Sequence, residues 1–70
     1  MENNKFRKGL LITSKGDGRR WYSDMVGQVV PLFEVEATEY RSSQRDGYVN
    51  FVQFGDAHIV DVLIEDYPDA

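Results

Sequence analysis

Cysteine is absent from this chain of 70 residues, and the only histidine is His58. The lack of cysteine excludes disulfide bonds and metal sites built on thiolates, and it fits a reducing cytoplasm. A chain of this length buries only about 60% of the surface that its unfolded form exposes, so its stability is marginal. Support must come from packing of the nine aromatic side chains or from association with another copy.

Long apolar runs are missing as well. Runs such as Leu10–Ile12 and Val29–Phe33 fall far short of the ~20 residues that cross a bilayer. The N-terminal segment Met1–Lys5 is polar and has no signal-peptide pattern. The sequence therefore predicts a soluble cytoplasmic protein without a membrane segment.

Groups that carry catalysis or bind metals are scarce. Strand alternation would place His58 on the face opposite Asp61, so these two residues form no local acid–base pair. The segment Gly16–Gly18 lacks the third glycine and the helix signal of a phosphate-binding loop, and the rest of a calcium loop is missing around it. We predict that the chain is not an enzyme and holds no metal or cofactor.

Short β-type segments alternate with turn signals along the chain. The longest segment, Gln28–Tyr40, alternates apolar and acidic residues from Phe33 on, which is typical of a half-buried strand. Pro31 marks an edge or a bulge near its start, because proline cannot donate a ladder hydrogen bond. The other expected strands are Gly9–Lys15, Tyr48–Phe54 and Ala57–Ile64, separated by turns at Gly16–Gly18, Ser42–Gly47 and Gly55–Asp56.

The fold expected from these segments is mostly β. No window of a dozen residues shows the apolar spacing of a helix. Four to five short strands must curl to limit their exposed edges, so we expect a small SH3-like barrel or a curled antiparallel meander. We expect a single domain over 1–70, in which residues 1–8 form a flexible basic arm and residues 65–70 a flexible acidic tail.

The net charge of −4 is divided unevenly along the chain. Residues 1–20 hold six of the eight basic residues and two acids, for a net charge of +4. Residues 21–70 hold two basic residues and ten acids, for a net charge of −8. Such asymmetry concerns the choice of partners rather than the fold, although ordinary solubility explains it as well.

The acidic residues form the first candidate binding surface. The members that we expect to contact a partner are Glu34, Glu36, Glu39, Asp56, Asp61, Glu65 and Asp66. Alternate strand residues lie ~6.8 Å apart, whereas each DNA strand has a phosphate every ~3.4 Å along the axis. Two acidic strands or a homodimer would therefore be needed to resemble a duplex. The alternative is that acidic strand faces only prevent aggregation.

Lys15 and the segment Arg19–Tyr22 form the second candidate surface. Basic residues beside aromatic ones can follow a phosphate backbone while bases stack on the rings. The alternative, which we favour, is that Trp21 anchors the core of a small barrel and that Arg19 and Arg20 are solvated. An acidic chain would also be repelled from nucleic acid, so direct nucleic-acid binding is not favoured.

Two motifs suggest a family. The segment Trp21–Val30, followed by a hairpin and then by Gly55–Val60, resembles small acidic SH3-like proteins of Bacillus and their phages. The resemblance covers about two thirds of the chain and implies the fold more than the function. Within that group, size and acidity are similar to host-takeover proteins of SPO1-type phages that inhibit the nucleoid protein HU by mimicking DNA.

Three functions follow as expectations. The first is an acidic DNA mimic that binds a basic host protein such as HU, with a homodimer supplying enough negative surface. The second is an SH3-like module that binds nucleic acid or a peptide through Arg19–Tyr22. The third is a structural or assembly component of a phage.

Overall fold

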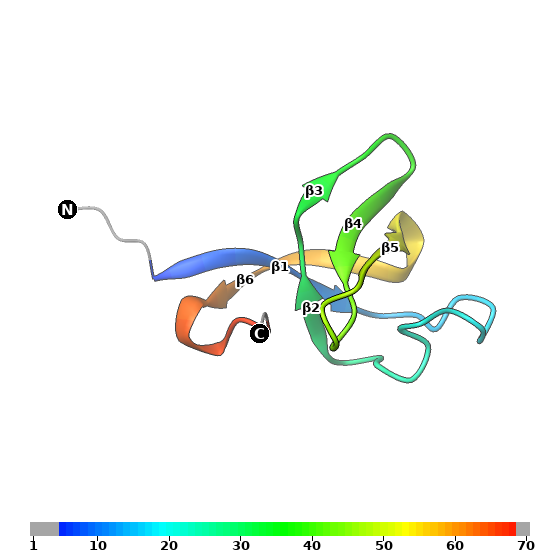
Figure 1. The fold of residues 1–70 in the computed structure, drawn as a ribbon, viewed down its shortest axis with the longest axis horizontal. Helices are drawn as coiled ribbons and strands as arrows, with labels where there is room; N and C mark the ends of the chain where they lie inside the picture. Colours follow the sequence, from blue (N-terminus) through cyan, green and yellow to red (C-terminus); the bar gives the residue numbers. More distant parts are fainter. Residues whose placement is uncertain (1–4, 69–70) are drawn as a thin grey trace.

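The computed structural model describes residues 5–68, which form six strands and two short 3-10 turns. The strands are β1 (Phe6–Ile12), β2 (Val29–Pro31), β3 (Glu34–Val35), β4 (Glu39–Ser43), β5 (Val49–Gln53) and β6 (Ala57–Leu63). The 3-10 turns are η1 (Phe54–Asp56) and η2 (Ile64–Asp66). The strands make two antiparallel sheets, ordered β2-β1-β6 and β3-β4-β5 (Figure 1). The predicted mostly β meander is confirmed, and the two sheets of the described chain do not close into a barrel.

Strand β1 is the centre of the first sheet because both of its edges are paired. Leu10 faces Val30 of β2 on one side and Ile59 of β6 on the other. The β1–β6 ladder runs without a bulge over the whole length of both strands. This ribbon projects from the body and gives the molecule its elongated shape, 43 Å long and 25 by 20 Å across (Figure 1).

The single long strand that we expected over Gln28–Tyr40 is divided between two sheets, so that prediction is wrong. Strand β2 ends at Pro31, and the chain then crosses to the second sheet, where β3 pairs with β4. The alternation that begins at Phe33 does not mark a buried face, because Phe33 is 43% and Val35 55% exposed. Pro31 lies on an edge strand, as expected, where its missing N–H removes no ladder bond.

The side chain of Tyr67 forms hydrogen bonds to two chain segments at the place where the two sheets separate. Its hydroxyl donates to the carbonyl of Lys8 at 2.5 Å and accepts from the N–H of Leu32 at 2.9 Å. Lys8 and Leu32 would be the next pair in the β1–β2 register, so the hydroxyl replaces a direct rung of the ladder. The guanidinium of Arg7 lies 4.1 Å from the centre of the Tyr67 ring. The junction between the sheets is thus hydrogen-bonded without strand pairing.

Part of each end that we expected to be flexible lies in regular structure. Residues 6–8 of the expected basic arm belong to β1 and pair with β6. In the expected acidic tail, Glu65 and Asp66 form part of η2, and Tyr67 is buried. Residues 1–4 and 69–70 lie outside the described residues. Both ends of the described chain are therefore built into the first sheet or packed on it.

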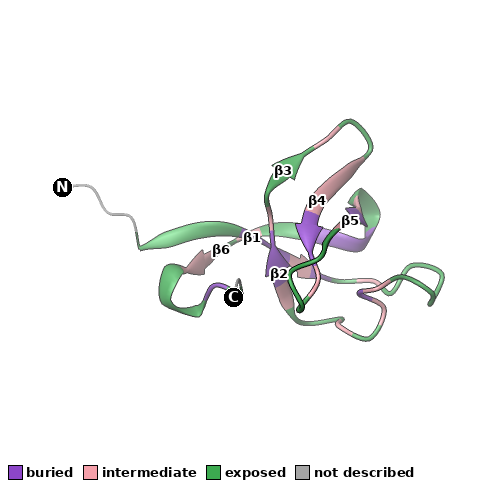
Figure 2. Ribbon diagram, in the orientation of Figure 1, coloured by how far each residue is buried: buried purple, intermediate pink, exposed green. Residues whose placement is uncertain are grey.

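The core lies where the two sheets face each other (Figure 2). Its buried side chains are Leu10, Ile12, Tyr22, Val30, Val52 and Ala57. Tyr22 is the largest fully buried side chain, whereas Trp21 is half-buried and packs edge-to-face on Tyr22 with 5.4 Å between ring centres. The expectation that Trp21 anchors the core is therefore corrected in favour of its neighbour Tyr22.

The substitution Tyr67→Phe tests whether the Tyr67 hydroxyl stabilises the junction between the two sheets. It leaves the carbonyl of Lys8 and the N–H of Leu32 without their partner, so we expect the free energy of unfolding to fall by about 1–3 kcal/mol. Urea denaturation monitored by circular dichroism measures the change. The matched control is Tyr48→Phe, because Tyr48 is 69% exposed. Equal stability of the two variants would contradict the bridging role.

Candidate binding surfaces

The register of the first sheet brings one basic and one acidic residue together from opposite ends of the chain. Strand β1 carries basic residues and β6 carries Asp61, and their pairing places Lys8 directly opposite Asp61. The Lys8 Nζ and Asp61 Oδ1 atoms lie 2.6 Å apart. Both side chains are largely exposed, so the ion pair adds little stability. Asp61, which we expected to contact a partner, therefore already has an opposite charge beside it.

The hairpin formed by β3 and β4 has a similar arrangement around Arg41. Glu34 faces Arg41 across the hairpin and accepts a hydrogen bond from its guanidinium. The Nε atom of Arg41 lies 3.5 Å from a carboxylate oxygen of Glu36. Residues that flank a tight turn face each other in a hairpin. A turn placed at residues 36–39 would have revealed this pairing from the sequence, but we had placed a continuous strand there.

Asp56 belongs to the interior rather than to an acidic surface, which corrects its assignment as a partner-binding residue. It is buried in η1, and its carboxylate accepts a hydrogen bond from the Tyr22 hydroxyl at 2.5 Å. The same hydroxyl accepts from the N–H of Gln53 at 3.3 Å. Burial raises the pKa of the Tyr22 hydroxyl, and the bond to Asp56 raises this pKa further. Tyr22 is therefore a neutral donor at neutral pH.

The other expected acids are spread over the surface. Glu39 is half-buried at the start of β4 and accepts a hydrogen bond from the side chain of Gln53 at 3.3 Å. Glu65 and Asp66 are exposed in η2. The seven expected residues thus divide into a hairpin group (Glu34, Glu36, Glu39), a ribbon group (Asp61, Glu65, Asp66) and the buried Asp56. They do not form one continuous acidic face.

Trp21 and Tyr22 cover the outer edge of β5. The β4–β5 register leaves the backbone groups of Phe51 and Gln53 pointing away from β4. The indole N–H of Trp21 donates to the carbonyl of Phe51 at 2.8 Å, and the hydroxyl of Tyr22 accepts from Gln53. The two aromatic side chains therefore make the hydrogen bonds to the edge of β5 that a neighbouring strand would otherwise make. Arg19 and Arg20 are exposed in the loop beside them, as expected.

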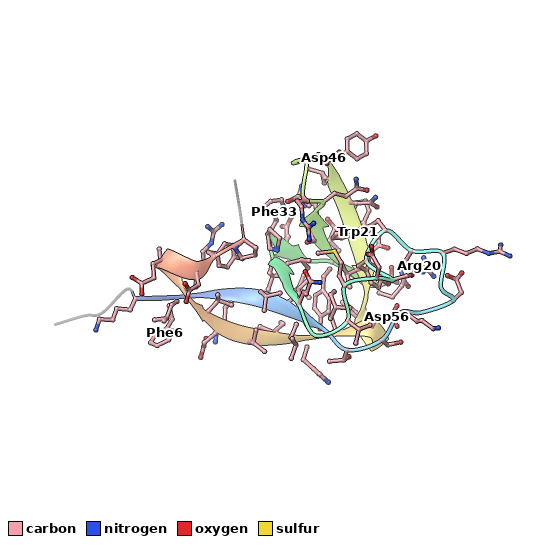
Figure 3. The ribbon with its side chains drawn as sticks, turned by 90° about the horizontal axis from the view of Figure 1, so that it is seen from below. Phe6, Arg20, Trp21, Phe33, Asp46 and Asp56 are labelled. Atoms are coloured by element: carbon pink, nitrogen blue, oxygen red, sulfur yellow. The ribbon has the colours of Figure 1, made fainter. Side chains whose placement is uncertain are left out.

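A groove lies between this loop and the turn that joins β4 to β5. It has a volume of about 420 Å³ and is lined by Trp21, Asp24, Met25, Gln28, Gln44, Arg45 and Asp46. Trp21 and Asp46 lie on its two walls (Figure 3). We call it the Trp21 groove. A smaller hollow of about 130 Å³ shares four of these residues and adds Val29, Val30, Pro31, Ser43 and Pro68.

Hydrogen bonds hold both walls of the Trp21 groove. In the loop, the hydroxyl of Ser23 donates to the carbonyl of Lys15 and accepts from the N–H of Arg20, both at 2.9 Å. In the turn, a carboxylate oxygen of Asp46 accepts from the N–H of Tyr48 at 3.0 Å, and Gly47 adopts a φ of 89°. The Asp46-Gly47 turn signal is thus confirmed, whereas the groove itself was missed by the sequence analysis.

Within residues 5–68, no group of three or more histidine, cysteine or acidic side chains is placed to hold a metal ion. No helix of the described chain has the length and apolar character that crossing a bilayer requires.

Searches of protein-family models, curated proteins and solved structures find no match to this chain. The resemblance to Bacillus phage proteins, the cytoplasmic location and the absence of enzymatic activity therefore stay predictions.

The raised pKa of Tyr22 predicts how stability depends on pH. The folded state holds this proton more tightly than the unfolded chain, whose tyrosine pKa is 10.0. The stability that the Tyr22 proton adds to the folded state is therefore complete below about pH 10. It is lost as the pH rises through the pKa that Tyr22 has in the folded protein. We expect Tyr22→Phe to reduce this alkaline loss, measured as urea midpoints at about pH 8 and at several values above 10. The matched control is Tyr48→Phe, which changes an exposed tyrosine outside the core.

Proposed function

We propose that the chain is a non-catalytic module that binds an extended segment of another protein in the Trp21 groove. The observation that carries the proposal is the position of Trp21. Its indole N–H is already bonded to Phe51, so the part of the ring that reaches the groove offers apolar surface rather than an unpaired donor. Binding sites commonly combine such apolar contacts with a few polar groups that fix orientation.

The lining of the groove indicates what kind of segment fits. Trp21 and Met25 supply an apolar wall, and Asp24 and Asp46 supply two carboxylates against the single cation Arg45. Arg45 reaches across to the side chain of Gln28, with 3.5 Å between donor and acceptor. An extended segment that combines apolar and basic side chains satisfies both kinds of wall. The two carboxylates disfavour phosphate, so a peptide fits this groove better than nucleic acid.

The adjoining hollow supports an extended ligand. It continues the lining from Gln28 along β2 to Pro31 and reaches Pro68 after η2. A folded partner surface would need a broad flat area, whereas a groove followed by a hollow accommodates a chain of alternating side chains. The partner is therefore still expected to be basic, but it binds in the Trp21 groove and not on the acidic residues that the sequence indicated.

A peptide titration tests the groove. Trp21 is the only tryptophan, so its fluorescence reports binding directly. We expect peptides that alternate leucine and lysine to shift this fluorescence with saturation, and leucine–glutamate peptides to have no effect. The double variant Asp24→Asn, Asp46→Asn weakens binding about tenfold, since two partly screened ion pairs contribute about 1.4 kcal/mol together.

The matched control is the double variant Glu65→Gln, Asp66→Gln, which changes the net charge equally at η2, outside the groove. Asparagine at position 46 can still accept the hydrogen bond from Tyr48, so the turn is preserved. An equal loss of affinity in both double variants would show nonspecific charge attraction and contradict the groove. Saturable binding without any change in Trp21 fluorescence would also contradict it.

DNA mimicry is the second candidate, and the β3–β4 hairpin favours it. Glu34, Glu36 and Glu39 lie within six residues of sequence on a hairpin that projects from the body (Figure 1). Arg41 fixes two of these carboxylates and neutralises one charge, so the hairpin keeps a net charge of −2 over these four residues. A basic DNA-binding surface could accept such a group where it otherwise holds phosphates.

A competition assay separates the two candidates. A purified HU-type nucleoid protein is loaded with a labelled DNA duplex, and the chain is added at increasing concentration. Mimicry predicts release of the DNA, weakened steeply by salt and lost in the triple variant Glu34→Gln, Glu36→Gln, Glu39→Gln. The Asp24→Asn, Asp46→Asn variant would compete like the wild type. Release that depends on the groove variant and not on the triple variant would refute mimicry by the hairpin.

A further inference from the structure

The outer edge of β6 has no neighbouring strand in the described chain. The N–H of Ile64 donates to the carbonyl of Lys5 at 2.7 Å, and the N–H of Thr13 donates to that of Asp56 at 2.9 Å. These bonds continue the β1–β6 register at both ends, and hydrogen-bonded pairs alternate along an antiparallel ladder. Four residues of β6 therefore point their backbone N–H and C=O groups away from β1, namely Ala57, Ile59, Asp61 and Leu63.

The other strand edges are short or covered. The edge of β5 is covered by Trp21 and Tyr22, β2 has three residues and includes Pro31, and β3 has two residues. Strand β6 has seven residues without a proline, lysine or bulge, and its one charged residue is paired with Lys8. Proteins usually block exposed edges by such devices. No ribbon lies beyond the outer side of β6 in Figure 3.

The sequence of β6 is complementary to itself in one antiparallel register. With a two-fold axis at Val60, Ile59 faces Asp61 of the second copy, and Ala57 faces Leu63 of the second copy. All four outward-pointing residues then find partners. An axis at Asp61 would place two equal charges opposite each other, which is unfavourable. An axis at Ile59 leaves Leu63 outside the paired segment.

We infer that two copies of this chain pair through their β6 strands about an axis at Val60, which joins their first sheets into one continuous sheet. The pairing is independent of the proposed function, because no residue of β6 lines the Trp21 groove. The partner is a second copy rather than a foreign strand, because the register above satisfies the outward groups of both strands at once. The interface also brings Val60 beside Val60 of the second copy.

Cysteine cross-linking tests the register, and the natural absence of cysteine makes the readout clean. In a non-hydrogen-bonded antiparallel pair the Cα atoms are about 4.5 Å apart, within the range that a disulfide bridges. We expect Val60→Cys to form a covalent dimer under mild oxidation. Val62→Cys is the matched control, because its two copies would lie about 13 Å apart in this register. Equal cross-linking of both variants, or none at position 60, overturns the inference.

Charge substitutions at Ile59 provide a second test by sedimentation equilibrium. Ile59→Asp places two aspartates opposite each other at two symmetric positions, so the dissociation constant should rise about tenfold or more. Ile59→Lys places a lysine opposite Asp61 of the second copy and should keep or strengthen the dimer. Circular dichroism confirms that both variants fold. A wild type that stays monomeric at millimolar concentration, or a dimer unaffected by Ile59→Asp, refutes pairing through β6.

Discussion

The hydroxyl of Tyr22 is the point on which the arrangement of the core and the groove depends. It donates to Asp56 in η1 and accepts from Gln53 at the end of β5. The carbonyl of Asp56 in turn accepts from the N–H groups of Thr13 and Ser14, where β1 leads into the long loop. One buried side chain thus links that loop, the second sheet and the start of β6. Because Trp21 is its neighbour in sequence, the wall of the groove is positioned by the same contacts.

Antiparallel pairing brings together opposite charges that lie far apart in the sequence. The first strand carries Arg7 and Lys8, the last carries Asp61, and the fold places these two strands side by side in opposite directions. Lys8 then meets Asp61, and Arg41 meets Glu34 by the same principle within a single hairpin. Glu34, Glu36 and Asp61 each lie beside a cation, so they present less negative charge to a partner. The geometry therefore favours a local groove over an extended charged face.

The sequence was sufficient to predict the elements whose signals are local. Strand β6, the strand over Val49–Gln53 and the Asp46-Gly47 turn all have short-range signatures, and each is present. The division of Gln28–Tyr40 could not be predicted from alternation, because it depends on Tyr67, which arrives from a distant part of the chain. The same applies to the groove, since its two walls meet only after both sheets have formed. Trp21 and Tyr22 were recognised as important, but which one is buried depends on the open edge of β5.

The pairing of β1 with β6 has a consequence for how the protein is made. The second sheet joins residues that lie close together in sequence, within 34–53, whereas the first joins Phe6 to Leu63. Contacts between distant residues slow folding because a long loop must close before they form. We expect the β3–β4–β5 sheet to form early during synthesis. The first sheet must wait until β6 has left the ribosome, so a nascent chain that stops before Ala57 has a central strand with no partner on that edge.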